Sequence, residues 1–128
     1  LSGQEARVNK AEALIKTARF LFDNGYYNDC ISRAYYAIYH AIIAILALRR
    51  NIVRHRWDHV ELYKAFLDNF CKRGFLLSQR DGSIFFELMT KRTQADYDMV
   101  VFSKKSVEGL LLKAEKLVAK IGQEMRDA

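Results

Sequence analysis

Three side chains capable of acid–base chemistry or phosphate binding recur along one short stretch of the chain. Arg33, Tyr36 and His40 stand within the run Ser-Arg-Ala-Tyr-Tyr-Ala-Ile-Tyr-His-Ala at residues 32–41. Seven residues are close to two helical turns, so Arg33 and His40 share one face about 10 Å apart along the axis. On an apolar helix these groups need partners, because a buried unpaired polar group costs about 1–3 kcal/mol. The stretch predicts either a structural hydrogen-bond network between helices or a polar pocket for a phosphate or a base.

A second polar group lies closer to the C-terminus. Arg92 and Asp96 are four residues apart, the spacing at which opposite charges pair along a helix. Asp96 could equally reach across to Arg33 and form an arginine–carboxylate bond between two helices. In a ligand site, Arg33 and Arg92 would hold phosphate, Asp96 would orient an arginine, and His40 would donate or accept a proton.

Two further spacings are compatible with catalysis or metal binding. Arg54 and His59 have four residues between them, and Arg33 and His40 have six. His55 and His59 stand four apart, as two metal ligands on one helix would. No third ligand accompanies them, so we expect neither a metal nor another cofactor. The alternative for this segment is a solvated connector followed by a helix N-terminus.

The composition predicts a small helical protein, and the net positive charge favours an anionic partner. The chain has 128 residues, of which 51% are apolar, and its net charge is +6. The length indicates one domain over residues 1–128, and the absence of proline favours an all-α fold. The positive charge favours nucleic acid or a nucleotide as the partner.

The cysteine pattern and the hydropathy predict a soluble, cytoplasmic protein. The two cysteines are far apart and form no zinc or disulfide motif, which is typical of a reducing compartment. The N-terminal residues lack the apolar core of a signal peptide. The longest apolar stretch, residues 37–48, is shorter than the roughly 20 residues needed to span a bilayer, so we expect no membrane contact.

Five stretches have the three- and four-residue spacing of apolar side chains that predicts amphipathic helices. Gly25 should end the first helix, and Asn28 or Asp29 should cap the second. We predict an up-and-down bundle of about five helices with the second, most hydrophobic helix at its centre. The broad stripes of the second and last helices are candidates for a homodimer contact. The predicted helices cover residues 8–22, 28–50, 58–70, 82–98 and 103–125.

The run at residues 32–41, followed by His59 and by Arg92 with Ala95-Asp96-Tyr97, resembles the HEPN superfamily. More narrowly, it resembles the small stand-alone bacterial and archaeal branch, and the resemblance covers nearly the whole chain in order. It implies an α-helical bundle that forms a homodimer. It also implies a minimal nucleotidyltransferase as partner in a toxin–antitoxin pair, or metal-independent ribonuclease activity.

The active ribonucleases of this superfamily carry an arginine, four to six further residues and then a histidine. The arginine would stabilise the phosphorane, and the histidine would accept the proton of the attacking 2′-hydroxyl. Here four residues follow Arg92, and then Tyr97 stands in place of the histidine. A phenol with a pKa near 10 is a poor base at neutral pH, so the sequence alone does not predict whether this protein is an active ribonuclease. Related domains carry a modified tyrosine near this place, which makes Tyr97 a candidate acceptor in nucleotide transfer.

The sequence thus leads to one hypothesis and two alternatives. The hypothesis is a HEPN-type accessory protein that works with a minimal nucleotidyltransferase, or binds RNA or a nucleotide in a groove. One alternative is a metal-independent endoribonuclease that uses Arg33 and His40, and the other is a structural dimeric module whose polar stripe sets helix register. The expected ligand-binding residues are Arg33, Tyr36, His40, His59 at the rim, Arg92, Asp96 and Tyr97.

Overall fold

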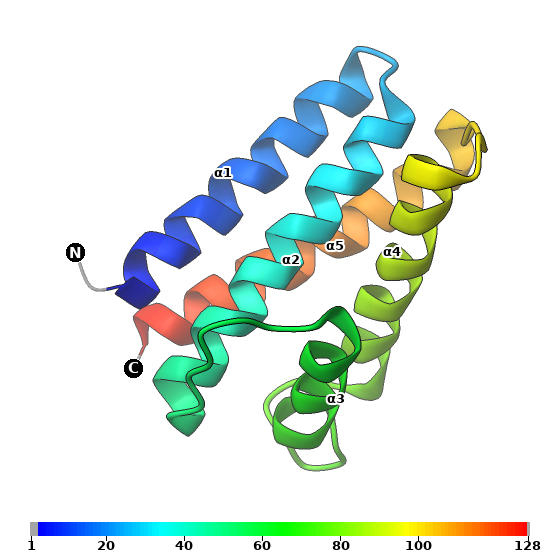
Figure 1. The fold of residues 1–128 in the computed structure, drawn as a ribbon. Coiled ribbons are helices and arrows are strands. Elements are labelled where there is room, and N and C mark those ends of the chain that lie inside the picture. The colour runs from blue at the N-terminus through cyan, green and yellow to red at the C-terminus, as the bar shows by residue number, and fades with distance from the viewer. Residues whose placement is uncertain (1–2, 128) are drawn as a thin grey trace.

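The chain folds into an all-α bundle, as predicted (Figure 1). This computed structural model describes residues 3–127, and no strand occurs within that range. The described helices are α1 (Gly3–Asp23), α2 (Tyr27–Arg50), α3 (His59–Phe70), α4 (Gln79–Tyr97) and α5 (Lys104–Arg126).

Helix α2 is the centre of the bundle. It runs antiparallel to α1, and α5 packs behind both helices (Figure 1). α4 lies along the other side of α2, and the short helix α3 packs against α2 and α4. Small side chains on α2 allow these neighbours to approach closely, and four of them are buried alanines: Ala34, Ala37, Ala41 and Ala44.

Among the described helices, α2 is also the one long and apolar enough to cross a membrane by length and composition alone. We expected residues 37–48 to be too short for this, but the whole helix has 24 residues. In the bundle, 56% of its most apolar window is buried inside the protein. Core helices of soluble proteins pass the same test, and the contacts of α2 with the four other helices account for its hydropathy.

The start of α2 differs from the prediction. The helix begins at Tyr27, and neither Asn28 nor Asp29 is its N-cap. The side-chain amide of Asn28 instead donates to the carbonyl oxygen of Val100 at 2.5 Å. Its oxygen accepts from the backbone N–H of Phe102 at 3.0 Å. Asn28 therefore holds the α4–α5 loop against α2.

Helix α4 begins at Gln79, three residues before the predicted start at Gly82. The Ser78 hydroxyl accepts from the backbone N–H of Asp81 at 3.2 Å, and the Asp81 carboxylate accepts from the Ser78 backbone at 2.9 Å. This capping box satisfies N–H groups that have no partner within the first helical turn. Gly82 lies inside the helix, at a position where a Cβ would collide with the side chain of Leu67.

Three other predicted helix ends are confirmed. Gly25 follows α1 with φ at +84°, a conformation that glycine adopts without steric cost. The Asp58 carboxylate caps α3 and accepts from the backbone N–H of Val60 at 2.8 Å. The Ser103 hydroxyl caps α5 and accepts from the backbone N–H of Ser106 at 3.3 Å.

The apolar stripes of α2 and α5 are filled by the protein's own helices. α5 packs its stripe onto α1 and α2, and α2 is covered by the four other helices. These stripes therefore do not supply the homodimer contact that we expected from their breadth, and a homodimer stays a prediction. The buried residues of α5 are Val107, Leu110, Leu111, Ala114, Leu117, Val118, Ile121, Gly122 and Met125.

Both cysteines are free and buried, in agreement with the expectation of no disulfide. Cys30 lies in the first turn of α2, and Cys71 directly follows α3. Burial raises the pKa of each thiol to about 12. Both thiols are therefore protonated at neutral pH.

Replacing Asn28 with alanine removes both hydrogen bonds to the α4–α5 loop. Each such bond contributes roughly 1 kcal/mol, so we expect Asn28→Ala to lower the free energy of unfolding by about 1–2 kcal/mol. Chemical denaturation followed by circular dichroism measures this change. Asn9→Ala on the exposed face of α1 is the matched control. An equal effect in both variants would contradict the role assigned to Asn28.

Candidate functional site

One stripe of α2 is not covered by the neighbouring helices, and its N-terminal half lies in a depression between α1 and α4. Its side chains are exposed or half-buried and recur every three or four residues. The three α2 residues predicted for the site all lie on this open stripe, as their helical spacing indicated. The open stripe consists of Asp29, Ser32, Arg33, Tyr36, His40, Ile43 and Ala47.

A surface depression of about 500 Å³ covers the N-terminal half of the open stripe. Arg33 and Tyr36 line it from α2, and Asp96 lines it from α4. Arg33 is exposed and has no hydrogen-bond or ion-pair partner within residues 3–127. The depression therefore combines a free guanidinium, a phenol and two carboxylates, those of Asp29 and Asp96. The other lining residues are Thr17, Leu21 and Ser32.

Arg92 lies behind this depression and is tied to it by hydrogen bonds. Its side chain is only 12% exposed. The guanidinium donates to the Tyr36 hydroxyl at 3.2 Å and to the Asp96 carboxylate at 3.4 Å. The hydroxyl of Ser32 donates to the other oxygen of Asp96 at 2.9 Å. These contacts bring α2 and α4 together, and the predicted pairing of Arg92 with Asp96 is present.

The Arg92 guanidinium also lies over two aromatic rings. Its central carbon is 5.2 Å from the ring centre of Tyr35 and 5.7 Å from that of Tyr36. Both rings attract the cation through their negative faces. The Nε atom of Arg92 is buried and has no hydrogen-bond partner among the described residues. Arg92 is thus a positioned cation with a single carboxylate, Asp96, to balance it.

His59 joins the same group of side chains through Tyr35. The Tyr35 hydroxyl is hydrogen-bonded to Nδ1 of His59, which is the first residue of α3. Burial raises the pKa of Tyr35, and burial together with the charge of Arg92 lowers the pKa of His59. At neutral pH we therefore expect a protonated phenol that donates to an uncharged imidazole. We call the set Ser32, Tyr35, Tyr36, His59, Arg92 and Asp96 the Arg92 cluster.

His40 lies apart from the Arg92 cluster. Its Nδ1 accepts a hydrogen bond from the guanidinium of Arg7 on α1 at 2.9 Å. Burial is the largest cause that lowers the pKa of His40 to about 4, followed by the charges of Lys10 and Arg7. Arg33 and His40 share the face of α2 that their spacing predicted, and the hydrogen-bond partner of His40 is Arg7 of α1.

Tyr97 lies outside the cluster as well. Its side chain is 73% exposed at the last residue of α4, and it has no hydrogen bond among the described residues. We expected Tyr97 to line the polar site together with Arg92 and Asp96. Five residues along a helix turn the side chain well past the face of Arg92, so Tyr97 faces solvent instead.

The other two spacings do not form a site. Arg54 bonds to Glu61 at 2.9 Å and lies over the ring of Trp57 rather than beside His59. His55 lies in the connector before α3, so His55 and His59 are not on one helix. Within residues 3–127, no three histidine, cysteine, aspartate or glutamate side chains gather in a way that could hold a metal.

Three residues of this region escaped the sequence analysis. Tyr35 is the fully buried link between Arg92 and His59, and Ser32 fixes the carboxylate of Asp96. Both belong to the run at 32–41, so the helical spacing alone could have indicated them. Arg7, the partner of His40, carries no such signal because the contact joins residues 33 positions apart.

The low pKa of His40 makes the stability of the protein depend on pH. The unfolded chain takes up a proton near pH 6.5, whereas the folded protein does so only near pH 4. Stability present above pH 6.5 is therefore lost as the pH falls from 6.5 towards 4. We expect a loss of about 1–2 kcal/mol between pH 7 and 5, allowing for screening by solvent.

Urea denaturation at several pH values measures this dependence. His40→Gln keeps an acceptor for Arg7 but cannot take up a proton, so it should remove most of the loss. His55→Gln is the matched control, since His55 is exposed in the connector. The same pH dependence in His40→Gln and in the unaltered protein would exclude His40 as its source.

Comparison with known proteins supports the resemblance noted in the sequence. The family profile described as HEPN domain matches residues 4–124, a range that reaches from the start of α1 to the last turn of α5. A protein of Methanocaldococcus jannaschii named "Putative toxin MJ0605" is 29% identical over 123 residues, or 96% of this chain and 89% of that protein. A "UPF0332 protein" of Archaeoglobus fulgidus is 30% identical over 125 residues, or 91% of this chain and 95% of that protein. The chain therefore belongs to the HEPN family.

Proposed function

We propose that this HEPN protein is a toxin-type protein that binds RNA or nucleotide phosphate at the Arg92 cluster and the adjoining depression. Two findings support the type of function. The relative from Methanocaldococcus jannaschii carries the word toxin in its name. The net charge of +6 favours an anionic ligand and raises its rate of encounter.

The observation that carries the proposal is the pair of arginines at the depression. Arg33 has free donors at the surface, while Arg92 is held behind it by Tyr36 and Asp96. A phosphate oxygen placed beside Tyr36 would meet both positive charges. Asp29 lines the depression too and would repel phosphate from its own end, which restricts the orientation of the ligand.

Half-buried aromatic rings next to these arginines suit a nucleic-acid strand. Tyr36 and Tyr39 lie 5.9 Å apart with their rings nearly perpendicular, and neither is fully buried. Exposed aromatic faces can stack on bases while arginines contact the backbone. In this proposal the strand would follow the open stripe of α2, with its phosphates at Arg33.

Fluorescence anisotropy with a labelled single-stranded RNA tests this proposal. We expect affinity to fall steeply between about 50 and 200 mM salt. Arg33→Gln should weaken binding roughly threefold and reduce the slope of log affinity against log salt by about 0.7. Arg73→Gln, on the exposed α3–α4 loop, is the matched control for the loss of one charge.

Arg92→Met is a second variant and should weaken binding roughly tenfold. Arg92 also contacts Tyr36 and Asp96, so its variant must first be shown to fold by circular dichroism. RNA binding that is equally strong in Arg33→Gln, Arg92→Met and Arg73→Gln would contradict the proposed site. No binding by the unaltered protein would favour the alternative of a structural dimeric module.

A second candidate function is metal-independent RNA cleavage, and His59 favours it. His59 is uncharged at neutral pH because of burial and the charge of Arg92, and it is hydrogen-bonded to Tyr35. With Nδ1 accepting from Tyr35, the neutral ring carries its proton on Nε2. To act as a general base, His59 would have to release the Tyr35 hydroxyl and accept the proton of a 2′-hydroxyl at Nδ1. The version of this function that uses Arg33 and His40 has less support, because His40 is bonded to Arg7. RNA cleavage in EDTA that is lost in His59→Gln and kept in His40→Gln would support it.

The proposed protein partner is a minimal nucleotidyltransferase, and Tyr97 is the residue that it would modify. We also propose that the protein is a homodimer and lies in the cytoplasm. The phenol of Tyr97 is accessible at the end of α4, so a second enzyme could reach it. Incubation with the cognate transferase and ATP should transfer AMP to the Tyr97 hydroxyl with release of pyrophosphate, which raises the intact mass by one AMP unit less one water. Tyr97→Phe should abolish this addition, and Tyr26→Phe, another exposed tyrosine, should not. Addition to both variants alike would exclude Tyr97 as the target.

A further inference from the structure

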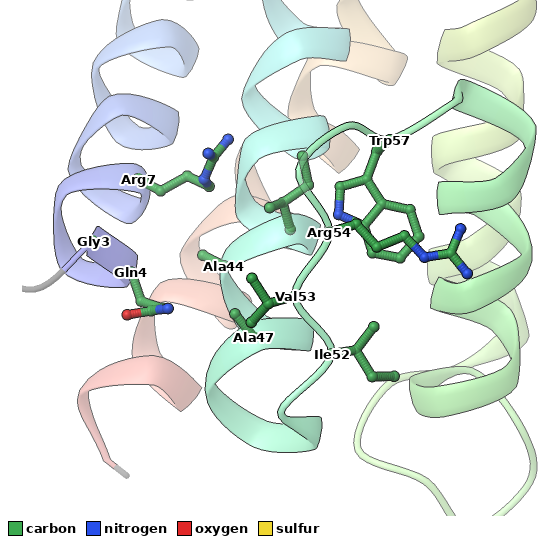
Figure 2. A pocket seen from close by; sticks show the side chains of 10 residues that line it. Gly3, Gln4, Arg7, Ala44, Ala47, Ile52, Val53, Arg54 and Trp57 are labelled. Atoms are coloured by element: carbon green, nitrogen blue, oxygen red, sulfur yellow. The ribbon is translucent and has the colours of Figure 1, made fainter.

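A second cavity lies at the opposite end of the open stripe from Arg33. It is enclosed by the first turns of α1, by α2 and by the connector between α2 and α3, and its volume is about 150 Å³ (Figure 2). A cavity of that size holds a ligand about as large as benzene. We call it the Arg7–Trp57 pocket, and it is lined by Gly3, Gln4, Arg7, Ile43, Ala44, Ala47, Ile52, Val53, Arg54 and Trp57.

Trp57 brings an unpartnered donor into this pocket. The residue is 8% exposed, and its indole Nε1 is buried without any hydrogen-bond partner among the described residues. Figure 2 shows the indole nitrogen on the side of the ring that faces α2. An indole N–H can only donate, and a buried donor without an acceptor destabilises the fold. The pocket therefore lacks an acceptor that a ligand could provide.

Arg7 supplies the positive charge of the pocket. In Figure 2 its side chain extends from α1 towards α2. It donates to His40, which is neutral, and it forms no ion pair with a carboxylate within residues 3–127. Gln4 adds a side-chain amide to the lining of the pocket. All these groups favour an anion.

Arg54 does not add a second free charge. Its guanidinium bonds to Glu61 at 2.9 Å and lies 4.5 Å from the ring centre of Trp57. Figure 2 shows its side chain extending across Trp57, away from α1. One uncompensated positive charge thus faces a small cavity whose remaining walls are mostly aliphatic.

We propose that the Arg7–Trp57 pocket binds a monovalent oxyanion group, either a carboxylate or a phosphodiester. Its oxygens would accept from Arg7 and from Trp57 Nε1, while the aliphatic walls would pack against the apolar part of the ligand. None of the pocket's residues belongs to the Arg92 cluster or to its depression. Ile43 and Ala47 line the pocket and also belong to the open stripe, but Arg7 and Trp57 do not, so variants at Arg7 and Trp57 test the pocket separately from Arg33 and Arg92.

The chain has one tryptophan, so its fluorescence reports directly on this pocket. The unaltered protein is titrated with acetate or dimethyl phosphate at constant ionic strength, with chloride as the balancing ion. We expect a saturable change in emission with at least one oxyanion. Saturation by acetate alone identifies a carboxylate site, and saturation by dimethyl phosphate alone identifies a phosphodiester site. An unchanged emission spectrum with both oxyanions would overturn the proposal. An equal change in emission in a separate titration with sodium chloride alone would overturn it as well.

Two variants locate the binding. Arg7→Gln should weaken oxyanion affinity, measured by the fluorescence titration, roughly tenfold. Arg56 lies next to Trp57 in the α2–α3 connector but does not line the pocket, so Arg56→Gln should leave the affinity unchanged. Trp57→Phe keeps the ring and removes the donor, so it should weaken binding severalfold when measured by isothermal titration calorimetry. Circular dichroism establishes that each variant is folded. Full affinity in both Arg7→Gln and Trp57→Phe would refute the assignment.

Discussion

Four neighbouring helices pack against α2, and this packing determines where polar side chains can lie. Packing on nearly all sides leaves one stripe of this helix in contact with solvent. Arg33, Tyr36 and His40 lie there because a buried position would leave their polar atoms without water or partners. The Arg92 cluster and the Arg7–Trp57 pocket consequently lie along the same helix, towards opposite ends. The packing of the core thus decides where the protein can carry polar chemistry.

Both sites hold an arginine mainly through uncharged partners. Arg92 contacts the rings of Tyr35 and Tyr36, and Arg7 donates to the neutral ring of His40. These partners restrict each guanidinium without neutralising it. Arg92 has one carboxylate partner in addition, Asp96 at 3.4 Å, in a single contact rather than a close bidentate one. The same burial that lowers the pKa of the histidines keeps them neutral in this role. A guanidinium that is already fixed in place needs little reorganisation to bind an anion.

Local patterns in the sequence predict much of this arrangement, but contacts between distant residues escape them. Apolar spacing predicted five helices, and the four-residue spacing predicted the bond between Arg92 and Asp96. Asn28 or Asp29 was expected to cap α2, yet the partners of Asn28 lie in a loop more than seventy residues away. The partner of His40 is likewise on another helix. Helical periodicity places a side chain on a face, but packing between helices decides which neighbour it meets.

The alkylation rates of the two buried thiols report how often the surrounding parts of the bundle open. Cys30 lies near the α1–α2 turn, and Cys71 lies where α3 ends, so they report on different parts of the fold. A protonated, shielded sulfur reacts slowly with alkylating reagents, and reaction therefore requires a transient opening of the segment around it. Unequal alkylation rates at the two sulfurs would reveal that one part of the bundle opens while the other stays closed.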